Sequence, residues 1–135
     1  MSKVFSARYN AGAFNIGMLI LRMASGVLII HHGYQKLSHY NEMKSQFMNF
    51  MGFGPSVSFG LVIFAEFFCG ILLVLGLFTR FACIPLVILM VVILYKVHAL
   101  DIFGKGEMDM LYLASFLTIL FCGPGMISVD SRIGK

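Results

Sequence analysis

Two histidines and a lysine, His31, His32 and Lys36, lie in the stretch HHGYQKL at residues 31–37, directly after an apolar segment. Their side chains donate hydrogen bonds and exchange protons. Further ionisable residues interrupt the apolar segments or lie near their ends: Arg22, Glu66, His98 and Glu107. Together these groups suit a pocket for a quinone-like molecule, whose carbonyl oxygens accept hydrogen bonds from His, Lys or Arg. A proton path and a purely structural polar core are the alternatives.

The elements that carry these residues are predicted to be membrane-spanning helices. The chain has 135 residues, of which 59% are hydrophobic and 12% are charged, whereas soluble domains contain about 25% charged residues. Four apolar segments approach the roughly 20 residues that a spanning helix needs, and they lack the alternating polar positions of a membrane barrel. We therefore predict an all-α membrane protein, a single domain over residues 1–135 with four transmembrane helices in an up-down bundle. The helices are expected at about residues 14–33, 57–78, 81–100 and 107–123.

The longest predicted connection joins the first two helices. It contains aromatic and methionine side chains among polar residues and ends in the turn-like sequence GFGP at residues 52–55. This spacing predicts a short interfacial helix on the outer surface of the membrane. The other connections are short, which is typical of helices that pack as antiparallel neighbours.

The basic residues favour a cytoplasmic location for both termini. The first apolar segment is interrupted by Arg22 and lacks a cleavage site of small residues, so we interpret it as a retained helix. With the N-terminus inside, the cytoplasmic side carries Lys3, Arg8, Arg80, Arg132 and Lys135, and the outer side carries Lys36, Lys44, Lys96 and Lys105. These residues are scattered along the chain and form no basic stripe, so we expect no nucleic-acid partner.

Arg22 and Glu66 are the two ionisable residues that lie deepest in the apolar segments. If the outer ends of the first two helices lie near Gly33 and Val57, both residues sit roughly 13 to 17 Å below that boundary. Opposite charges at one depth offset part of each other's desolvation, so we predict a contact between them. The pair could be structural or functional.

A helical wheel indicates which side chains face inward. Arg22 shares a face with the small residues Gly26 and Gly33, and this face continues to His32 and Lys36, while His31 points the opposite way. On the third helix we expect His98 to face inward and Lys96 to reach the headgroups. At the start of the fourth helix Asp109 is explained by capping, and Glu107 is the candidate. The predicted polar site is Arg22, His32, Lys36, Glu66, His98 and Glu107.

The sequence offers no metal site. Cys69, Cys83 and Cys122 lie in apolar segments without a CxxC motif or a partner at ligand spacing, and are expected to pack as small hydrophobic residues. Haem ligation by His32 and His98 is disfavoured, because helix bundles often bury histidines without a metal.

Several motifs, read together, resemble the DoxX family of small four-helix membrane proteins. They span nearly the whole chain: His32-Gly33-Tyr34-Gln35-Lys36-Leu37, Glu66 followed by Gly70, Leu75-Gly76-Leu77-Phe78-Thr79-Arg80, His98, Glu107, and Gly123-Pro124-Gly125 with Ser128 and Asp130. The resemblance implies a bacterial inner-membrane protein associated with oxidoreductase systems, such as the small subunit of thiosulfate:quinone oxidoreductase. It also favours His32 over His31 and supports the polar site given above. It does not supply a reaction.

We therefore expect a subunit that binds a quinone or a similar apolar ligand and assists a membrane or soluble oxidoreductase partner. It is not expected to be a self-sufficient redox enzyme, because it has no cysteine pair, iron-sulfur spacing or dinucleotide-binding glycines. A membrane scaffold or assembly factor and a small transporter are the other readings. Faces of small residues also allow a homo-oligomer.

Overall fold

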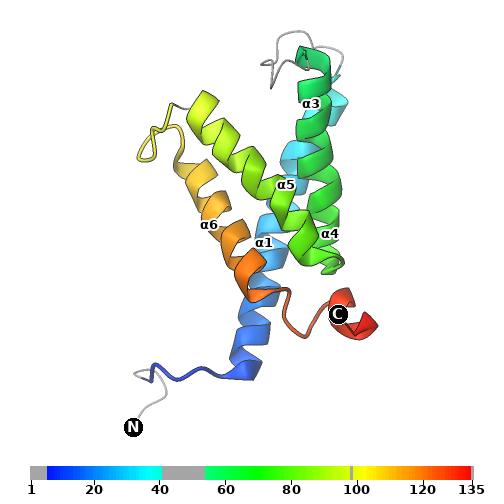
Figure 1. The fold of residues 1–135 in the computed structure, drawn as a ribbon, viewed down its shortest axis with the longest axis vertical. Helices are drawn as coiled ribbons and strands as arrows, with labels where there is room; N and C mark the ends of the chain where they lie inside the picture. The colour runs from blue at the N-terminus through cyan, green and yellow to red at the C-terminus, as the bar shows by residue number, and fades with distance from the viewer. Residues whose placement is uncertain (1–5, 41–53, 98, 135) are drawn as a thin grey trace.

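The structure, a computed structural model, describes residues 6–40, 54–97 and 99–134 (Figure 1). These residues form helices and no strand. In chain order the elements are α1 (Ala11–Ser38), α3 (Pro55–Ile63), the π-helix η2 (Phe64–Cys69), α4 (Gly70–Leu75), α5 (Thr79–Val92), the π-helix η3 (Ile93–Val97), α6 (Glu107–Cys122) and α7 (Val129–Ile133). Because α3, η2 and α4 follow one another without a break, they form one continuous rod, as do α5 and η3.

Three helical rods of the described chain are long and apolar enough to cross a membrane: Ala11–Ser38, Ser56–Leu75 and Thr79–Lys96. The prediction of an all-helical membrane protein is confirmed to this extent. The fourth helix, α6, has 16 residues, so it is about 24 Å long, whereas a typical hydrocarbon core is about 30 Å thick. It packs mainly against α5 and also against α1. Because α6 is shorter than the hydrocarbon core is thick, the helix lengths do not establish the predicted bundle of four spanning helices.

Helix α1 is longer than the predicted range of residues 14–33. It begins at Ala11, where the side chain of Asn10 accepts a hydrogen bond from the Ala13 amide at 3.0 Å, and it continues to Ser38. Nothing after Gly33 interrupts the helix, so the HHGYQKL stretch is helical throughout. The predicted interfacial helix would fall mostly in residues 41–53, which lie outside the described residues.

Glycines bring α1 into close contact with the second rod. A Cβ atom added at Gly33 would lie 2.7 Å from the backbone nitrogen of Phe67, and one at Gly70 would lie 2.8 Å from the Ile30 side chain. At Gly26 the nearest atom would belong to Val74, 2.6 Å away. Backbone contacts of this kind are typical of small-residue interfaces between membrane helices. They fix the antiparallel register of the two rods.

Arg22 lies at the hairpin end of this interface and is almost completely buried, with 1% of its surface exposed. Its Nη1 atom donates to the carbonyl oxygens of Leu73 and Val74, at 3.2 and 3.3 Å, and its Nη2 atom donates to that of Ile127. Leu73 and Val74 belong to the last turn of α4, where the helix dipole makes a cation favourable. Arg22 therefore ties α1 to the end of α4 and to the C-terminal tail.

Asp130 completes this arrangement from α7. Its carboxylate accepts hydrogen bonds from the amides of Phe78 and Thr79, at 2.8 and 2.9 Å, and so caps the start of α5. Its own amide donates to the carbonyl oxygen of Gly76 at 2.9 Å. Asp130 also lies within electrostatic range of Arg22. The C-terminal tail thus binds the turn between α4 and α5.

The predicted contact between Arg22 and Glu66 is wrong. Glu66 instead pairs with Lys36, which lies about 21 Å farther along α1 than Arg22 at the α-helical rise. The prediction assumed that the first helix ends near Gly33, whereas the structure packs Gly33 against the backbone of Glu66 and Phe67. The two charges therefore lie at different depths, and each has its own partners.

The close approach at Gly33 gives a prediction for stability. Gly33→Ala places a Cβ against backbone atoms that cannot rotate away, so it should lower the free energy of unfolding by about 1–3 kcal/mol. Gly17→Ala is the matched control, because a Cβ at Gly17 meets nothing within 4 Å. That control should be neutral or stabilising by up to about 1 kcal/mol. Thermal unfolding in mild detergent measures both, and equal melting temperatures would contradict the packing described.

Candidate functional site

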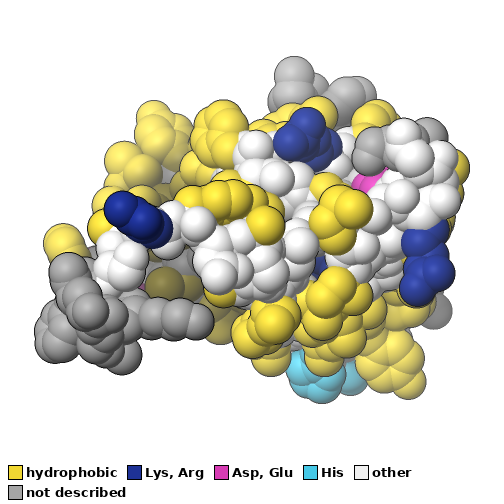
Figure 2. Space-filling view, turned by 90° about the horizontal axis from the view of Figure 1, so that it is seen from below, with side chains coloured by type: hydrophobic (Ala, Val, Ile, Leu, Met, Phe, Trp, Pro, Cys, Tyr) yellow, Lys and Arg dark blue, Asp and Glu magenta, His cyan; other side chains and the backbone are white. Residues whose placement is uncertain are grey.

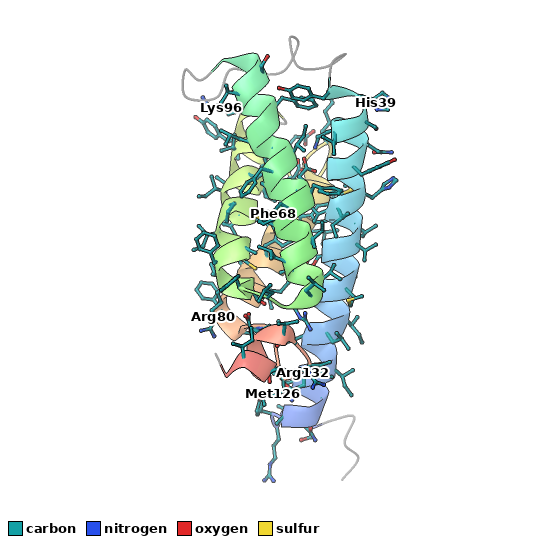
Figure 3. All side chains as sticks on the ribbon, turned by 90° about the vertical axis from the view of Figure 1, so that its right-hand side faces the viewer. His39, Phe68, Arg80, Lys96, Met126 and Arg132 are labelled. Atoms are coloured by element: carbon teal, nitrogen blue, oxygen red, sulfur yellow. The ribbon has the colours of Figure 1, made fainter. Side chains whose placement is uncertain are left out.

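A cavity of about 260 Å³ lies among α1, the second rod, the α5–η3 rod and α6. Its walls combine apolar and polar side chains: Ile29, Val62, Met90, Ile93 and Met108 on the apolar side, and His32, Lys36, Glu66, Asp109 and Tyr112 on the polar side. It lies toward the end of the bundle that carries Lys96 and His39, opposite the end with Arg80 and Arg132 (Figure 3).

The central interaction of the cavity is an ion pair between the Nζ atom of Lys36 and the Oε1 atom of Glu66. Glu66 is 2% exposed and Lys36 is 25% exposed. Burying a carboxylate this deeply is costly unless a cation and hydrogen bonds replace its water. Lys36, one turn beyond Gly33, supplies that cation because the Gly33 contact holds η2 close to α1.

Both π-helices border this cavity. Glu66 belongs to η2, and Ile93, the first residue of η3, lines the opposite wall. A π-turn inserts extra residues into a helix and changes the direction of the side chains that follow, and such turns are frequent at functional sites. Here the π-turn of η2 holds Glu66, Ala65 and Cys69 on the buried face.

His32 contributes an imidazole to the cavity from α1. Its ring meets that of Tyr112 edge-on, with ring centres 6.1 Å apart and planes at 83°. Tyr112 in turn stacks on Phe116 at 5.7 Å. The neighbouring His31 is exposed. The orientation of the two histidines agrees with the helical wheel, and whether His32 binds a ligand remains a prediction.

At the start of α6, Asp109 lines the cavity and Glu107 does not. Asp109 is buried and lines the cavity, within electrostatic range of His32 and Glu66, whereas Glu107 is exposed. Sequence reasoning missed Asp109 because capping already explained it. A signal was present: Asp109, Tyr112 and Phe116 recur at helical spacing, so they share the inward face of α6.

The predicted site residues therefore separate into groups. The structure brings His32, Lys36 and Glu66 together, places Arg22 at the other end of the bundle, and leaves Glu107 exposed. His98 lies outside the described residues. Within the described part of the chain, no three His, Cys, Asp or Glu side chains are grouped so that they could hold a metal ion.

This arrangement can bind a molecule that has both a polar and an apolar part. Imidazole, ammonium and phenol groups donate hydrogen bonds, and the carboxylates of Glu66 and Asp109 accept them or exchange protons. The apolar side of the cavity can enclose a flat ring. The volume is just below the roughly 300–1,000 Å³ typical of pockets for drug-sized ligands, so it suits a single head group.

Comparison with known proteins agrees with this membrane architecture. The family model named DoxX matches residues 17–99, which include His32, Lys36 and Glu66. A protein of Mycobacterium tuberculosis named "Uncharacterized membrane protein Rv3486" is 29% identical over 133 residues, covering 87% of this chain and 82% of the relative. A Bacillus subtilis protein named "Putative oxidoreductase CatD" is 28% identical over 126 residues, covering 91% of both chains. No solved structure matches. Because the family model covers more than half of the sequence, the chain belongs to the DoxX family.

Proposed function

We propose that the chain binds a quinone, or a similar apolar molecule with a polar head, in the cavity among α1, η2, α5 and α6. The observation that carries the proposal is a cavity that combines apolar walls with the Lys36–Glu66 pair, His32 and Tyr112. Small-molecule sites typically have this composition, with few polar groups placed in a mostly apolar enclosure.

The side chains of the cavity suit a quinone head. His32 and Tyr112 can donate hydrogen bonds to carbonyl oxygens, and Lys36 keeps donors in addition to the one used by Glu66. A bound quinone supplies redox chemistry that is coupled to protons. Glu66 and Asp109 are the groups of this chain that would take up or release those protons.

The chain is proposed to work with an oxidoreductase partner in the membrane of a bacterium. The word oxidoreductase in the name of the Bacillus subtilis relative supports this association, and both relatives named above are bacterial. Arg22 binds the end of α4 and Asp130 caps the start of α5, so both fit a structural role and are left out of the proposed ligand site.

We also propose that α6 is a fourth crossing and that both termini are cytoplasmic. The N- and C-terminal segments meet at one end of the structure, where the Met126 amide donates to the Asn15 side chain at 3.1 Å. This geometry supports an even number of crossings. Arg80 and Arg132 lie at that end, whereas Lys96 lies at the other (Figure 3). Seen from below, Lys and Arg side chains are separated by hydrophobic ones (Figure 2).

The two adjacent histidines allow a matched test of ligand binding. Protein purified in mild detergent should carry a quinone, detected in an organic extract by mass spectrometry. His32→Ala should reduce the bound quinone by about 10- to 100-fold, the effect of losing a hydrogen-bond donor to a buried acceptor. His31→Ala should leave it unchanged, because His31 is exposed. A wild-type extract without quinone, or equal loss in both variants, would refute the proposal.

The ion pair allows a structural role to be separated from a ligand-binding role. Lys36→Met leaves Glu66 buried without its cation, so it should destabilise the fold, by less than the roughly 3–5 kcal/mol of a fully buried pair because Lys36 is partly exposed. The double variant Lys36→Met with Glu66→Gln should recover most of that stability and still fail to bind quinone. Thermal unfolding and quinone extraction measure the two properties. Recovery of both would make the pair purely structural.

The topology can be tested by labelling intact cells. In a variant whose three cysteines are replaced by alanine, Lys105→Cys should react with a membrane-impermeant maleimide, because the α5–α6 connection lies outside. Arg132→Cys should react only after the cells are opened. Both positions are exposed in the structure, so burial does not explain a difference. Labelling of both positions from outside would contradict a fourth crossing.

A further inference from the structure

A second hollow lies on the surface of the protein, between α3, η2 and α5. It is a groove of about 260 Å³ whose walls include Leu61, Phe64, Ile84, Pro85 and Ile88. Its one polar lining residue, Ser58, donates its hydroxyl hydrogen to the carbonyl oxygen of Gly54 at 2.7 Å. The groove therefore offers a ligand almost nothing but apolar contact.

The groove exists because two rods diverge. Near the hairpin α5 packs against η2 and α4, and farther along it leans toward α6 and away from α3 (Figure 1). Side chains on both walls of the groove are about half exposed: Phe64 of η2 is 49% exposed and Ile88 of α5 is 52% exposed. Because these rods cross the membrane, the groove opens sideways to lipid and not to water.

Val62 lies between the groove and the cavity. This buried side chain, 6% exposed, lines both of them. On α5 the two hollows use adjacent positions, with Leu89 in the groove and Met90 in the cavity. One layer of side chains therefore separates the groove from the polar groups around Glu66.

We propose that the groove holds the apolar tail of the molecule whose polar head occupies the cavity, and that this molecule enters sideways from the bilayer. The inference rests on the proposed function and narrows the ligand class to a single-ring head with a long alkyl or isoprenoid tail. Two observations support the tail as the occupant: only the layer of side chains that includes Val62 separates the groove from the cavity, so a ligand that displaces this layer can reach both, and the cavity has room for a head group alone.

The test compares two quinones that share one ring, one with an alkyl tail and one without. Both are titrated into the full chain in lipid nanodiscs. Ile88→Trp fills the groove from a half-exposed position, so the fold should tolerate it. Val91→Trp is the control, because Val91 is 48% exposed on the same helix and does not line the groove. The tailed quinone also partitions into the lipid of the nanodisc. This effect is the same for every variant, so it does not contribute to a difference in affinity between variants.

We expect the tailed quinone to bind wild type and Val91→Trp at least about tenfold more tightly than the tail-less one. Ile88→Trp should weaken binding of the tailed quinone by about tenfold relative to wild type and leave the affinity of the tail-less quinone unchanged. A second measurement needs no variant: a tailed quinone with a diazirine at the end of its tail should label peptides from α3 and α5 on illumination.

Other outcomes overturn the inference in distinguishable ways. An unchanged tail preference in Ile88→Trp, with binding still dependent on His32, would reject the groove and keep the proposed function. A phospholipid that native mass spectrometry finds in wild type and not in Ile88→Trp, with quinone binding unaffected, would assign the groove to a lipid acyl chain. Failure of both quinones to bind wild type would reject the proposed function together with the groove.

Discussion

A charged side chain inside a membrane raises the free energy of the protein until other groups replace the water it has lost, and this constraint shapes both ends of the bundle. Glu66 is held by Lys36 across the α1–η2 interface. Arg22 is held by carbonyl oxygens at the end of α4 and in the tail. Each charge is therefore satisfied by a different segment of the chain, so the segments cannot separate without exposing it.

The glycine contacts and the charges depend on each other. Gly33 lets the backbone of η2 approach α1, and this approach brings Glu66 within reach of Lys36 one turn away. Near the other end, the Gly26 contact sets the level at which Arg22 meets the last turn of α4. Packing supplies the register, and the charges penalise any other register. The same two rods thus carry the end that Arg22 and the tail hold together and the end that contains the candidate site.

Much of the helical architecture could be predicted from the sequence, because long apolar segments have few alternatives in a membrane. The inward orientation of His32 also follows from one helix considered alone. The partner of Glu66 could not be predicted in this way, since it depends on how far α1 continues past Gly33 and on its register against η2. A change of a few residues in this register moves a side chain by several ångströms, and the composition of the segments does not indicate which register forms.

Asp109 shows a different limit of sequence reasoning. An acidic residue in the first turn of a helix already has a local explanation, because the helix dipole favours a carboxylate there. The sequence of that turn alone therefore gives no reason to place Asp109 in the site. Only the packing of α6 shows that this carboxylate faces His32 and Glu66. The candidate site is thus built from residues that are individually ordinary and become distinctive where four segments meet.

The contacts of Arg22 have a consequence for the order of biosynthesis. Arg22 belongs to α1, yet Ile127, which accepts one of its hydrogen bonds, lies 105 residues later in the chain, and Asp130 follows it. Until that segment has been made, the Arg22 guanidinium group has only its partners at the end of α4. These contacts can form only after the segment around α7 has been made, so we expect the bundle to close after that segment has left the ribosome.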